Sequence, residues 1–354
     1  MIDPGRDSTE MPIEEPTTRS KLDRFGPVAA FVALGVIAVM LIAGIFLSVT
    51  FGGDEFSDLE AEGLHLYTDG EWSEAAAVLT TLIDSYPVTD HEALALAHYR
   101  RSLVYFEQGL IEDALADESA AIGHNPSDTT LLALLYLNRS REYSYLGMTD
   151  ESIADATAAI DLKTSDTTTL ARAYVNRAQG LSAVDRGEEA VADFTAAIEI
   201  SPVRSDRDSV LVFRAEELAR IGRFNDAIDD ATAAIDALSS YGAETRDGTR
   251  ATTSELLGRA YLTRGNARFF LSGETDTLDD VADQVETDLS HAIDLLPENE
   301  PERLARAHFS RGSLHYFTWN DEAARHDLEH VQELVPERHH LYQSSAELLA
   351  DIIT

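Results

Sequence analysis

The sequence is poor in several residue types, and each shortage excludes a class of protein. Its 354 residues include no cysteine, which excludes a disulfide framework, thiolate catalysis and cysteine-based zinc or iron–sulfur sites. Basic residues are scarce: 27 Lys and Arg stand against 64 Asp and Glu, for a formal net charge of -37. Because nucleic-acid binding relies on Lys and Arg that displace counterions from phosphates, DNA and RNA are not expected as partners.

One long apolar run lies near the N-terminus. Residues 27–51 carry no charged side chain, and as a helix they would extend roughly 37 Å, enough to cross a hydrocarbon core about 30 Å thick. A buried core helix is disfavoured because soluble helices rarely stay apolar on every face. A cleaved signal peptide is disfavoured because the run is too long and no typical cleavage site follows it. The sequence therefore predicts a transmembrane helix over 27–51 that contacts the lipid bilayer.

The charges that flank this run predict its orientation. Basic residues precede it and acidic residues follow it: Arg19, Lys21 and Arg24 on one side, and Asp54, Glu55, Asp58 and Glu60 on the other. Basic flanks stay in the cytoplasm, so we expect a single-pass protein with a cytoplasmic N-terminus and an extracytoplasmic bulk. Residues 1–26 contain scattered prolines without hydrophobic periodicity, which predicts a disordered cytoplasmic tail.

Two short phrases alternate along the rest of the chain. The strings DESAAI, DATAAI, DFTAAI, DATAAI and DLSHAI occur in this order between Asp117 and Ile293, and strings such as YRRS, LNRS and VNRA precede them. Self-similarity with a period of about 20 to 50 residues is typical of repeat architectures. Because both phrases recur together, each unit is predicted to be a pair of helices.

Small residues mark the places where the two helices of a unit should cross. In the first helices these residues are Gly63, Ser102, Ser140, Ala178, Ala215, Gly265 and Gly312. Two helices approach closely only where a side chain is absent or very short. Prolines close several units, at Pro87, Pro126, Pro202, Pro297 and Pro336, and glycines at 70, 109, 147 and 222 can form the turn between helices.

This arrangement of small residues and closing prolines resembles the tetratricopeptide repeat. The resemblance implies an all-α solenoid of about seven helical hairpins with a C-terminal capping helix, preceded by the single transmembrane helix. The units are expected at about 56–89, 95–128, 133–166, 171–204, 208–241, 258–299 and 305–338 of an array over 56–338, and the capping helix at 339–354. Their spacing, about 37 to 39 residues over the first five units, exceeds the ~34 residues typical of the family.

The resemblance also implies a function. Repeats of this family present a concave groove, lined by the first helices, that receives a peptide or a partner helix, so we expect a non-enzymatic scaffold without cofactor or metal. The groove residues are predicted to be Tyr99, Arg100, Asn138, Arg141, Arg172, Asn176, Phe269, Phe270, Phe309, Tyr316 and Phe317. The acidity of the array favours a basic or polar protein or peptide as the partner.

Two alternatives remain open. The apolar C-terminal segment could mediate self-association, which would make the chain a homo-oligomeric structural component of the cell envelope. The string from His326 to His330, with Glu329 between them, matches the H-x-x-E-H pattern of a zinc peptidase. No third ligand is identifiable, and the repeat pattern already explains this segment.

Overall fold

The computed structural model describes residues 54–240, 249–275 and 277–353. Over these ranges the chain forms helices joined by short turns, without a strand, and the prediction of an all-α chain is confirmed there. The predicted tail at 1–26 and the predicted transmembrane helix at 27–51 lie outside the described residues. Within the described ranges, no helix has the length and apolar character that a membrane span requires.

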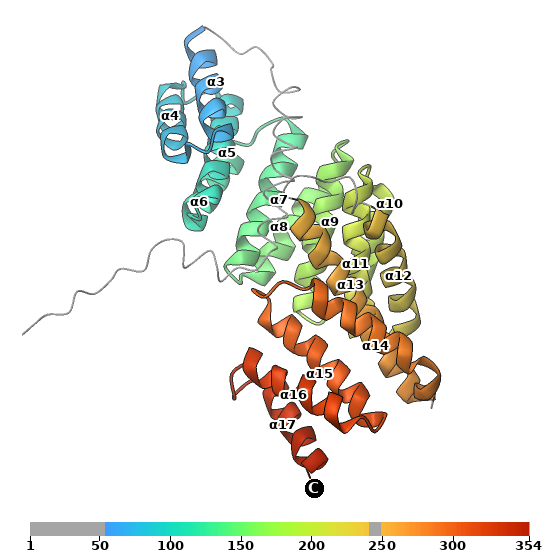
Figure 1. Ribbon diagram of the computed structural model, residues 1–354. Coiled ribbons are helices and arrows are strands. Elements are labelled where there is room, and N and C mark those ends of the chain that lie inside the picture. Colours follow the sequence, from blue (N-terminus) through green and yellow to red (C-terminus); the bar gives the residue numbers. More distant parts are fainter. Residues whose placement is uncertain (1–53, 241–248, 276, 354) are drawn as a thin grey trace, which may run out of the picture.

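Fifteen helices succeed one another along the described chain (Figure 1). The first eight are α3 (Asp54–Thr68), α4 (Trp72–Ser85), α5 (His91–Glu107), α6 (Ile111–Gly123), α7 (Thr129–Tyr145), α8 (Thr149–Asp161), α9 (Thr167–Ala183) and α10 (Gly187–Ile200). They are followed by α11 (Arg204–Arg220), α12 (Phe224–Ser239), α13 (Thr249–Thr275), α14 (Leu278–Leu295), α15 (Pro301–Phe317), α16 (Asp321–Leu334) and α17 (His340–Ile353). Each odd-numbered helix from α3 to α15 packs against the even-numbered helix that follows it, and α17 packs against α15 and α16.

Local sequence explains where many helices begin and end. Asp90, Asp128 and Asp166 precede α5, α7 and α9, and their carboxylates accept hydrogen bonds from amides of the first turn, which satisfies donors that the helix itself cannot pair. Four of the turns inside hairpins contain a glycine at positive φ, at positions 70, 109, 147 and 222. Glycine adopts this left-handed conformation without steric cost, so the predicted turn residues are confirmed.

The small residues lie where the helices of a hairpin touch. Ser102, Ser140, Ala178 and Ala215 have no exposed surface. At Gly312, an added Cβ would lie 3.0 Å from Cγ of Leu328 on the second helix of that hairpin. The close approach of the two helices therefore depends on the absence of a larger side chain.

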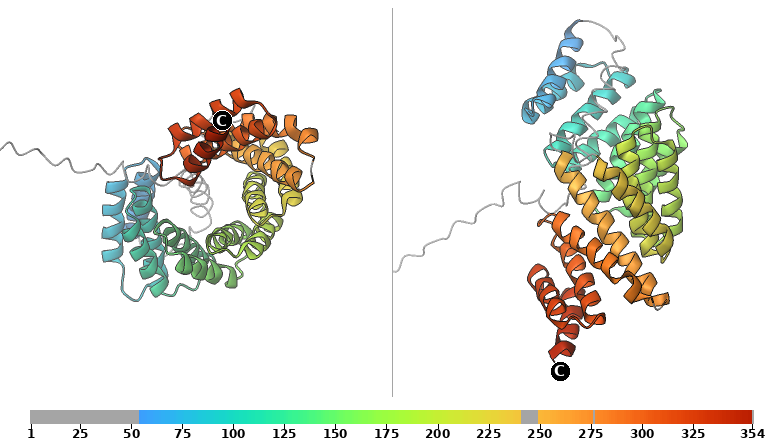
Figure 2. Two further views of the ribbon diagram at one scale, coloured as in Figure 1. Left: turned by 90° about the horizontal axis from the view of Figure 1, so that it is seen from below. Right: turned by 45° about the vertical axis from the view of Figure 1, so that its right-hand side comes forward.

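The hairpins stack into a curved solenoid, and in the view from below the helices follow one another around a curve (Figure 2). First helices contact first helices of the next hairpin, as between α7 and α9, α11 and α13, and α13 and α15. Among the described helices, no comparable contact joins two second helices. The first helices therefore occupy the inner side of the curve, and the second helices occupy the outer side.

The sixth hairpin accommodates extra residues without losing its alignment. The sequence predicts about eight extra residues between its helices, and the structure places most of them inside α13 and α14. On the side of the connecting turn each helix is longer by about one turn than in the other hairpins, and because a turn takes 3.6 residues, both keep the same faces toward each other. Helix α13 has 27 residues in all, against 17 in α5, because it also begins earlier. The insertion therefore lengthens the hairpin instead of adding a loop.

The C-terminal helix α17 covers the end of the array. Leu341 is 6% exposed and packs with Val331 and Val335 of the seventh hairpin. One face of α17 is thus used inside the chain, and the described contacts give the self-association alternative no support.

Candidate interaction surface

An arginine–aspartate pair joins the two helices of six hairpins. The arginine directly precedes the small residue of the first helix, and its Nε and Nη2 donate to the two carboxylate oxygens of an aspartate on the second helix. The pairs are Arg101 with Asp117, Arg139 with Asp155, Arg177 with Asp193, Arg214 with Asp230, Arg264 with Asp288, and Arg311 with Asp327. Such bidentate pairs fix direction as well as distance.

In five of these hairpins the same guanidinium also reaches the hairpin before it. Nη1 donates to a hydroxyl on the preceding second helix: Thr80, Ser119, Thr195, Thr232 and Ser290 accept from Arg101, Arg139, Arg214, Arg264 and Arg311, respectively. One arginine thereby connects three helices and two hairpins. These contacts stabilise the stacking that gives the inner face its curvature.

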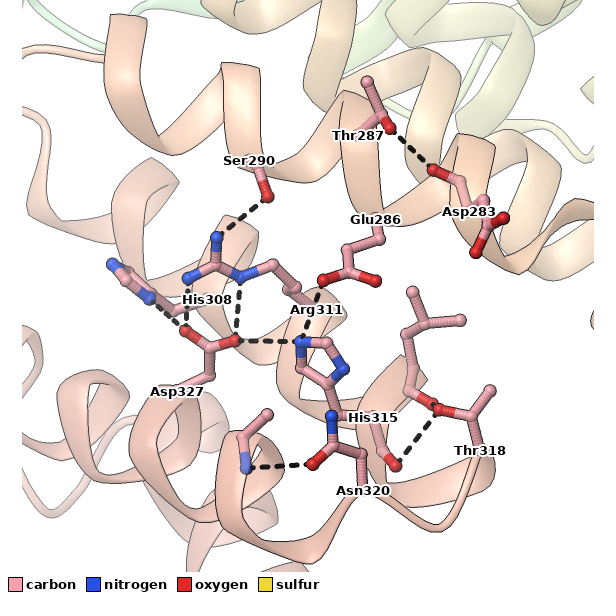
Figure 3. A network of polar contacts seen from close by, with 12 residues as sticks. Asp283, Glu286, Thr287, Ser290, His308, Arg311, His315, Thr318, Asn320 and Asp327 are labelled. Atoms are coloured by element: carbon pink, nitrogen blue, oxygen red, sulfur yellow. Dashed lines mark hydrogen bonds and ion pairs between the residues drawn. The ribbon is translucent and has the colours of Figure 1, made fainter.

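Figure 3 shows this arrangement in the seventh hairpin, where His308, Arg311 and His315 surround the carboxylate of Asp327. Nδ1 of His308 lies 2.9 Å from Asp327, and Nε2 of His315 lies 3.9 Å from both Asp327 and Glu286. Burial alone would raise the pKa of Asp327, but the hydrogen bonds from Arg311 and His308 together lower it to about 2. Asp327 therefore stays ionised and holds α15 and α16 together.

The H-x-x-E-H string lies on α16 beside this network. The rings of His326 and His330 meet edge to face at 4.7 Å, and Nδ1 of His330 lies 2.9 Å from the carboxylate of Glu333. Nowhere in the described ranges do three or more His, Cys, Asp or Glu side chains gather as a metal site requires. The zinc-peptidase alternative thus has no support in the geometry.

A buried polar cluster occupies the joint between the second and third hairpins. Glu118 and Glu142 have no exposed surface, and Arg141 is 8% exposed. The guanidinium of Arg141 lies over the ring of Phe106 at 3.8 Å and only 3.5 Å from Oε1 of Glu142. Burial and the neighbouring Glu142 raise the pKa of Glu118 well above its usual value, and burial also raises the pKa of Glu142. The joint therefore favours the neutral form of both carboxyl groups.

A second polar cluster joins the first helices α11 and α13. Arg259 donates two hydrogen bonds, of 2.9 and 2.6 Å, to the carboxylate of Glu216. Burial alone would raise the pKa of Glu216, but Arg259, with Arg303 and Arg306 farther away, lowers it. This pair links neighbouring hairpins along the inner side of the solenoid.

Aromatic side chains gather toward the C-terminal ends of α13 and α15. Phe269 lies 6.1 Å from Phe317 and 6.0 Å from Phe270, and Phe270 stacks on Phe224 at 5.8 Å. Phe270 and Phe317 are each 56% exposed. Half-exposed phenylalanines from neighbouring hairpins form an apolar surface that no described element covers.

The predicted groove residues divide into two groups. Tyr99, Asn138 and Arg141 are less than a tenth exposed and belong to the buried cluster of the second and third hairpins. The others are partly or largely exposed: Arg100, Arg172, Asn176, Phe269, Phe270, Phe309, Tyr316 and Phe317. Two of them bond to other first helices, because Arg100 pairs with Glu60 and Nδ2 of Asn176 donates to the carbonyl of Leu137. Their part in binding a partner stays a prediction.

Sequence reasoning missed residues that the structure makes prominent. In the arginine–aspartate pairs, the two residues belong to the two recurring strings of the sequence. Only the structure shows that the arginine of one string forms hydrogen bonds with the aspartate of the other. Trp319 was also missed, although it occupies the turn position that is glycine in four other hairpins and is 90% exposed. Aligning the turns as well as the helices would have found it.

Comparison with known proteins identifies the fold and no closer relationship. No family model matches the sequence, and no curated protein matches it. A tetratricopeptide repeat protein from Parabacteroides merdae is 14% identical with a TM-score of 0.51, over 85% of this chain and 100% of that one. A STAND signal-transduction ATPase with a tetratricopeptide repeat sensor, from Pyrococcus horikoshii, is 14% identical with a TM-score of 0.55, over 78% of this chain and 40% of that one.

A third solved structure, a Rap protein complexed with competence and sporulation factor, is 11% identical with a TM-score of 0.52. The match covers 85% of this chain and 86% of that one. At these identities the similarities establish a tetratricopeptide-type helical solenoid as the fold.

Proposed function

We propose that this chain is a membrane-anchored, non-enzymatic scaffold that binds a partner protein on the inner face of its solenoid. The observation that carries the proposal is the continuous inner face, which the first helices of successive hairpins build by contacting one another through their backbones or side chains. An extended surface of this kind is how stacked helical repeats bind partners. The similar Rap protein was solved in complex with competence and sporulation factor, which supports a binding role for this fold.

The inner face offers two kinds of contact. Its middle section carries the half-buried side chains of Arg172 and Asn176, which suit polar groups of a partner. Its C-terminal section carries the half-exposed rings of Phe270 and Phe317, which suit apolar groups. A partner that contacts both sections would therefore carry apolar side chains as well as the basic or polar side chains predicted from the sequence.

The proposed scaffold is held at a membrane by its N-terminal segment. The apolar run at 27–51 and its flanking charges are the support for a single-pass protein whose solenoid lies outside the cytoplasm. Protease added to right-side-out membrane vesicles should then digest the solenoid. Protection of the solenoid in sealed vesicles, with digestion only after detergent is added, would contradict this orientation.

Site-specific crosslinking tests the binding face. A photoreactive amino acid at Arg306, exposed on the first helix α15, should crosslink the partner in native membranes. The matched control places it at Glu199, exposed on the second helix α10. Adducts at the inner position alone support the proposal, whereas adducts at the outer position alone, or the same adducts at both, would overturn it.

A further inference from the structure

Trp319 occupies a turn position where the fold favours glycine. It lies between α15 and α16 with φ of 60°, and the corresponding turns of four other hairpins have a glycine at 70, 109, 147 or 222 with φ between 73° and 80°. A residue with a Cβ is strained in this left-handed conformation, and a bulky one more than most. The seventh hairpin therefore has a tryptophan at a position where glycine would relieve backbone strain.

The indole of Trp319 does not contribute to the core. It is 90% exposed, and Phe317, two residues before it, is 56% exposed. Phe317 in turn contacts Phe269 of the sixth hairpin, next to the half-exposed Phe270. A backbone outlier that holds a large apolar side chain in solvent is the kind of local strain found at binding sites.

The turn that carries Trp319 leads into an acidic first turn of α16. Asp321 and Glu322 follow Trp319 in the first turn of α16 and are exposed, and Asp351 of α17 accepts a hydrogen bond from the hydroxyl of Tyr316. A pocket of about 370 Å³ opens at the residues that follow Trp319, and it is lined by Asn320, Glu322 and Ala323 together with Arg311, His315, His326 and Asp327. The pocket itself is therefore of mixed charge, and the acidic groups near the rings are those of the first turn of α16. Aromatic faces with carboxylates around them attract cationic side chains.

We propose that Trp319, Phe317 and Phe270 form a docking surface for a cationic, apolar-bearing segment of the partner protein. This inference rests on the proposed scaffold function and names the chemistry of its partner. Apolar side chains of the segment would cover the phenylalanine rings, and an Arg or Lys would lie against the indole near Asp321 and Glu322. A second copy of this chain is a poor occupant, because each copy has a net charge of -37.

Fluorescence can test this surface directly, because the chain has only two tryptophans. In the full chain held in nanodiscs of zwitterionic lipid, Trp72→Phe leaves Trp319 as the single reporter. The probe is a short amphipathic peptide of leucine and arginine, and two control peptides replace its arginines by glutamate or its leucines by serine. We expect only the leucine–arginine peptide to shift the emission of Trp319 to shorter wavelength and to protect it from iodide quenching. Unchanged emission at peptide concentrations that bind the chain would overturn the inference.

The variant Trp319→Gly separates binding from folding. We expect the midpoint of thermal unfolding to stay the same or to rise, and the affinity for the leucine–arginine peptide, measured by calorimetry, to fall about tenfold or more. Asp185→Gly is the matched control, because Asp185 has φ of 59° in the equivalent turn between α9 and α10 but lies in another hairpin. Its affinity for the peptide should not change. Equal affinities of Trp319→Gly and the unsubstituted chain would contradict the proposal.

Phe317→Ser gives a second test of the same surface and should lower the affinity for the leucine–arginine peptide to a similar degree. Trp72→Ser, on α4 at 38% exposed, is its control. If these substitutions leave the affinity for the peptide unchanged while crosslinks to a native partner still map to the inner face, this inference fails and the scaffold function stands. If no inner-face crosslinks form, the scaffold function fails independently.

Discussion

At the scale of single residues, the arginines next to the crossing points do more than neutralise charge. Each guanidinium is 14% to 23% exposed as a side chain, and each paired aspartate is 2% to 14% exposed. Partial burial strengthens the attraction within a pair but makes the loss of one partner expensive. The pairs therefore fix the geometry of each hairpin more than they add to its net stability.

Removing one aspartate should reveal this cost. We expect Asp155→Ala to lower the free energy of unfolding by about 2 to 4 kcal/mol, because Arg139 is left without its carboxylate in a half-buried position. Urea denaturation followed by circular dichroism measures the change. The control Asp161→Ala removes an exposed carboxylate at the end of the same helix, α8, and should not destabilise the chain. Equal effects of the two substitutions would mean that the pair is not structural.

Glu255 should make stability depend on pH. Neither Arg259 at 3.9 Å nor Arg303 at 4.0 Å forms a hydrogen bond with it, and burial, with the nearby Glu300, raises its pKa from 4.5 to about 7. The folded chain favours the neutral form of Glu255, so the stability that this side chain contributes is fully present below pH 4.5 and is lost as the pH rises through 7.

We therefore expect Glu255→Gln to be more stable than the unsubstituted chain by up to about 3 kcal/mol above pH 7, since the pKa rises from 4.5 to about 7 and one pKa unit corresponds to 1.36 kcal/mol. The difference in stability between Glu255→Gln and the unsubstituted chain should shrink as the pH falls toward 4.5. Thermal unfolding across this range measures the difference, with the exposed Glu302→Gln as control. Parallel curves for Glu255→Gln and the unsubstituted chain would show that Glu255 does not titrate in this range.

At the scale of the helical hairpin, the crossing point limits what can be substituted. A Cβ at position 312 would lie 3.0 Å from Leu328, while alanine fills the matching place of the fourth and fifth hairpins, at 178 and 215, without exposed surface. Gly312→Ala should therefore cost less than about 1 kcal/mol. Gly312→Leu should cost about 3 kcal/mol because the two helices must separate. Chemical denaturation distinguishes the two, and equal stability would show that the crossing is not tightly packed.

Much at this scale could be predicted from the sequence, because a hairpin is determined by residues close together in the chain. The small residues, the closing prolines and the four glycine turns are local signals, and the structure confirms the turns. The sixth hairpin shows the limit of that reasoning. Whether its extra residues form a loop or longer helices depends on the register between α13 and α14, which their packing decides.

At the scale of the whole molecule, the excess of acidic residues should work against the folded state. Like charges distributed over one solenoid repel each other, and salt screens exposed charges more than the half-buried arginine–aspartate pairs. We expect the melting temperature to rise from low ionic strength to about 0.5 M NaCl. Sodium chloride is preferable to sulfate, which stabilises proteins through exclusion from their surface. A fall in melting temperature would mean that net attraction between surface charges dominates.

The sequence by itself determined that this chain is a series of helical hairpins with a small residue at each crossing and a highly acidic composition. It did so because those features depend on neighbouring residues and on composition. Only the tertiary structure decided which side chains meet across hairpins: that each recurring arginine binds the recurring aspartate, and that Arg141 and Asn138 are buried. It also decided that Trp319 remains in solvent, since exposure depends on how successive hairpins stack around the curve.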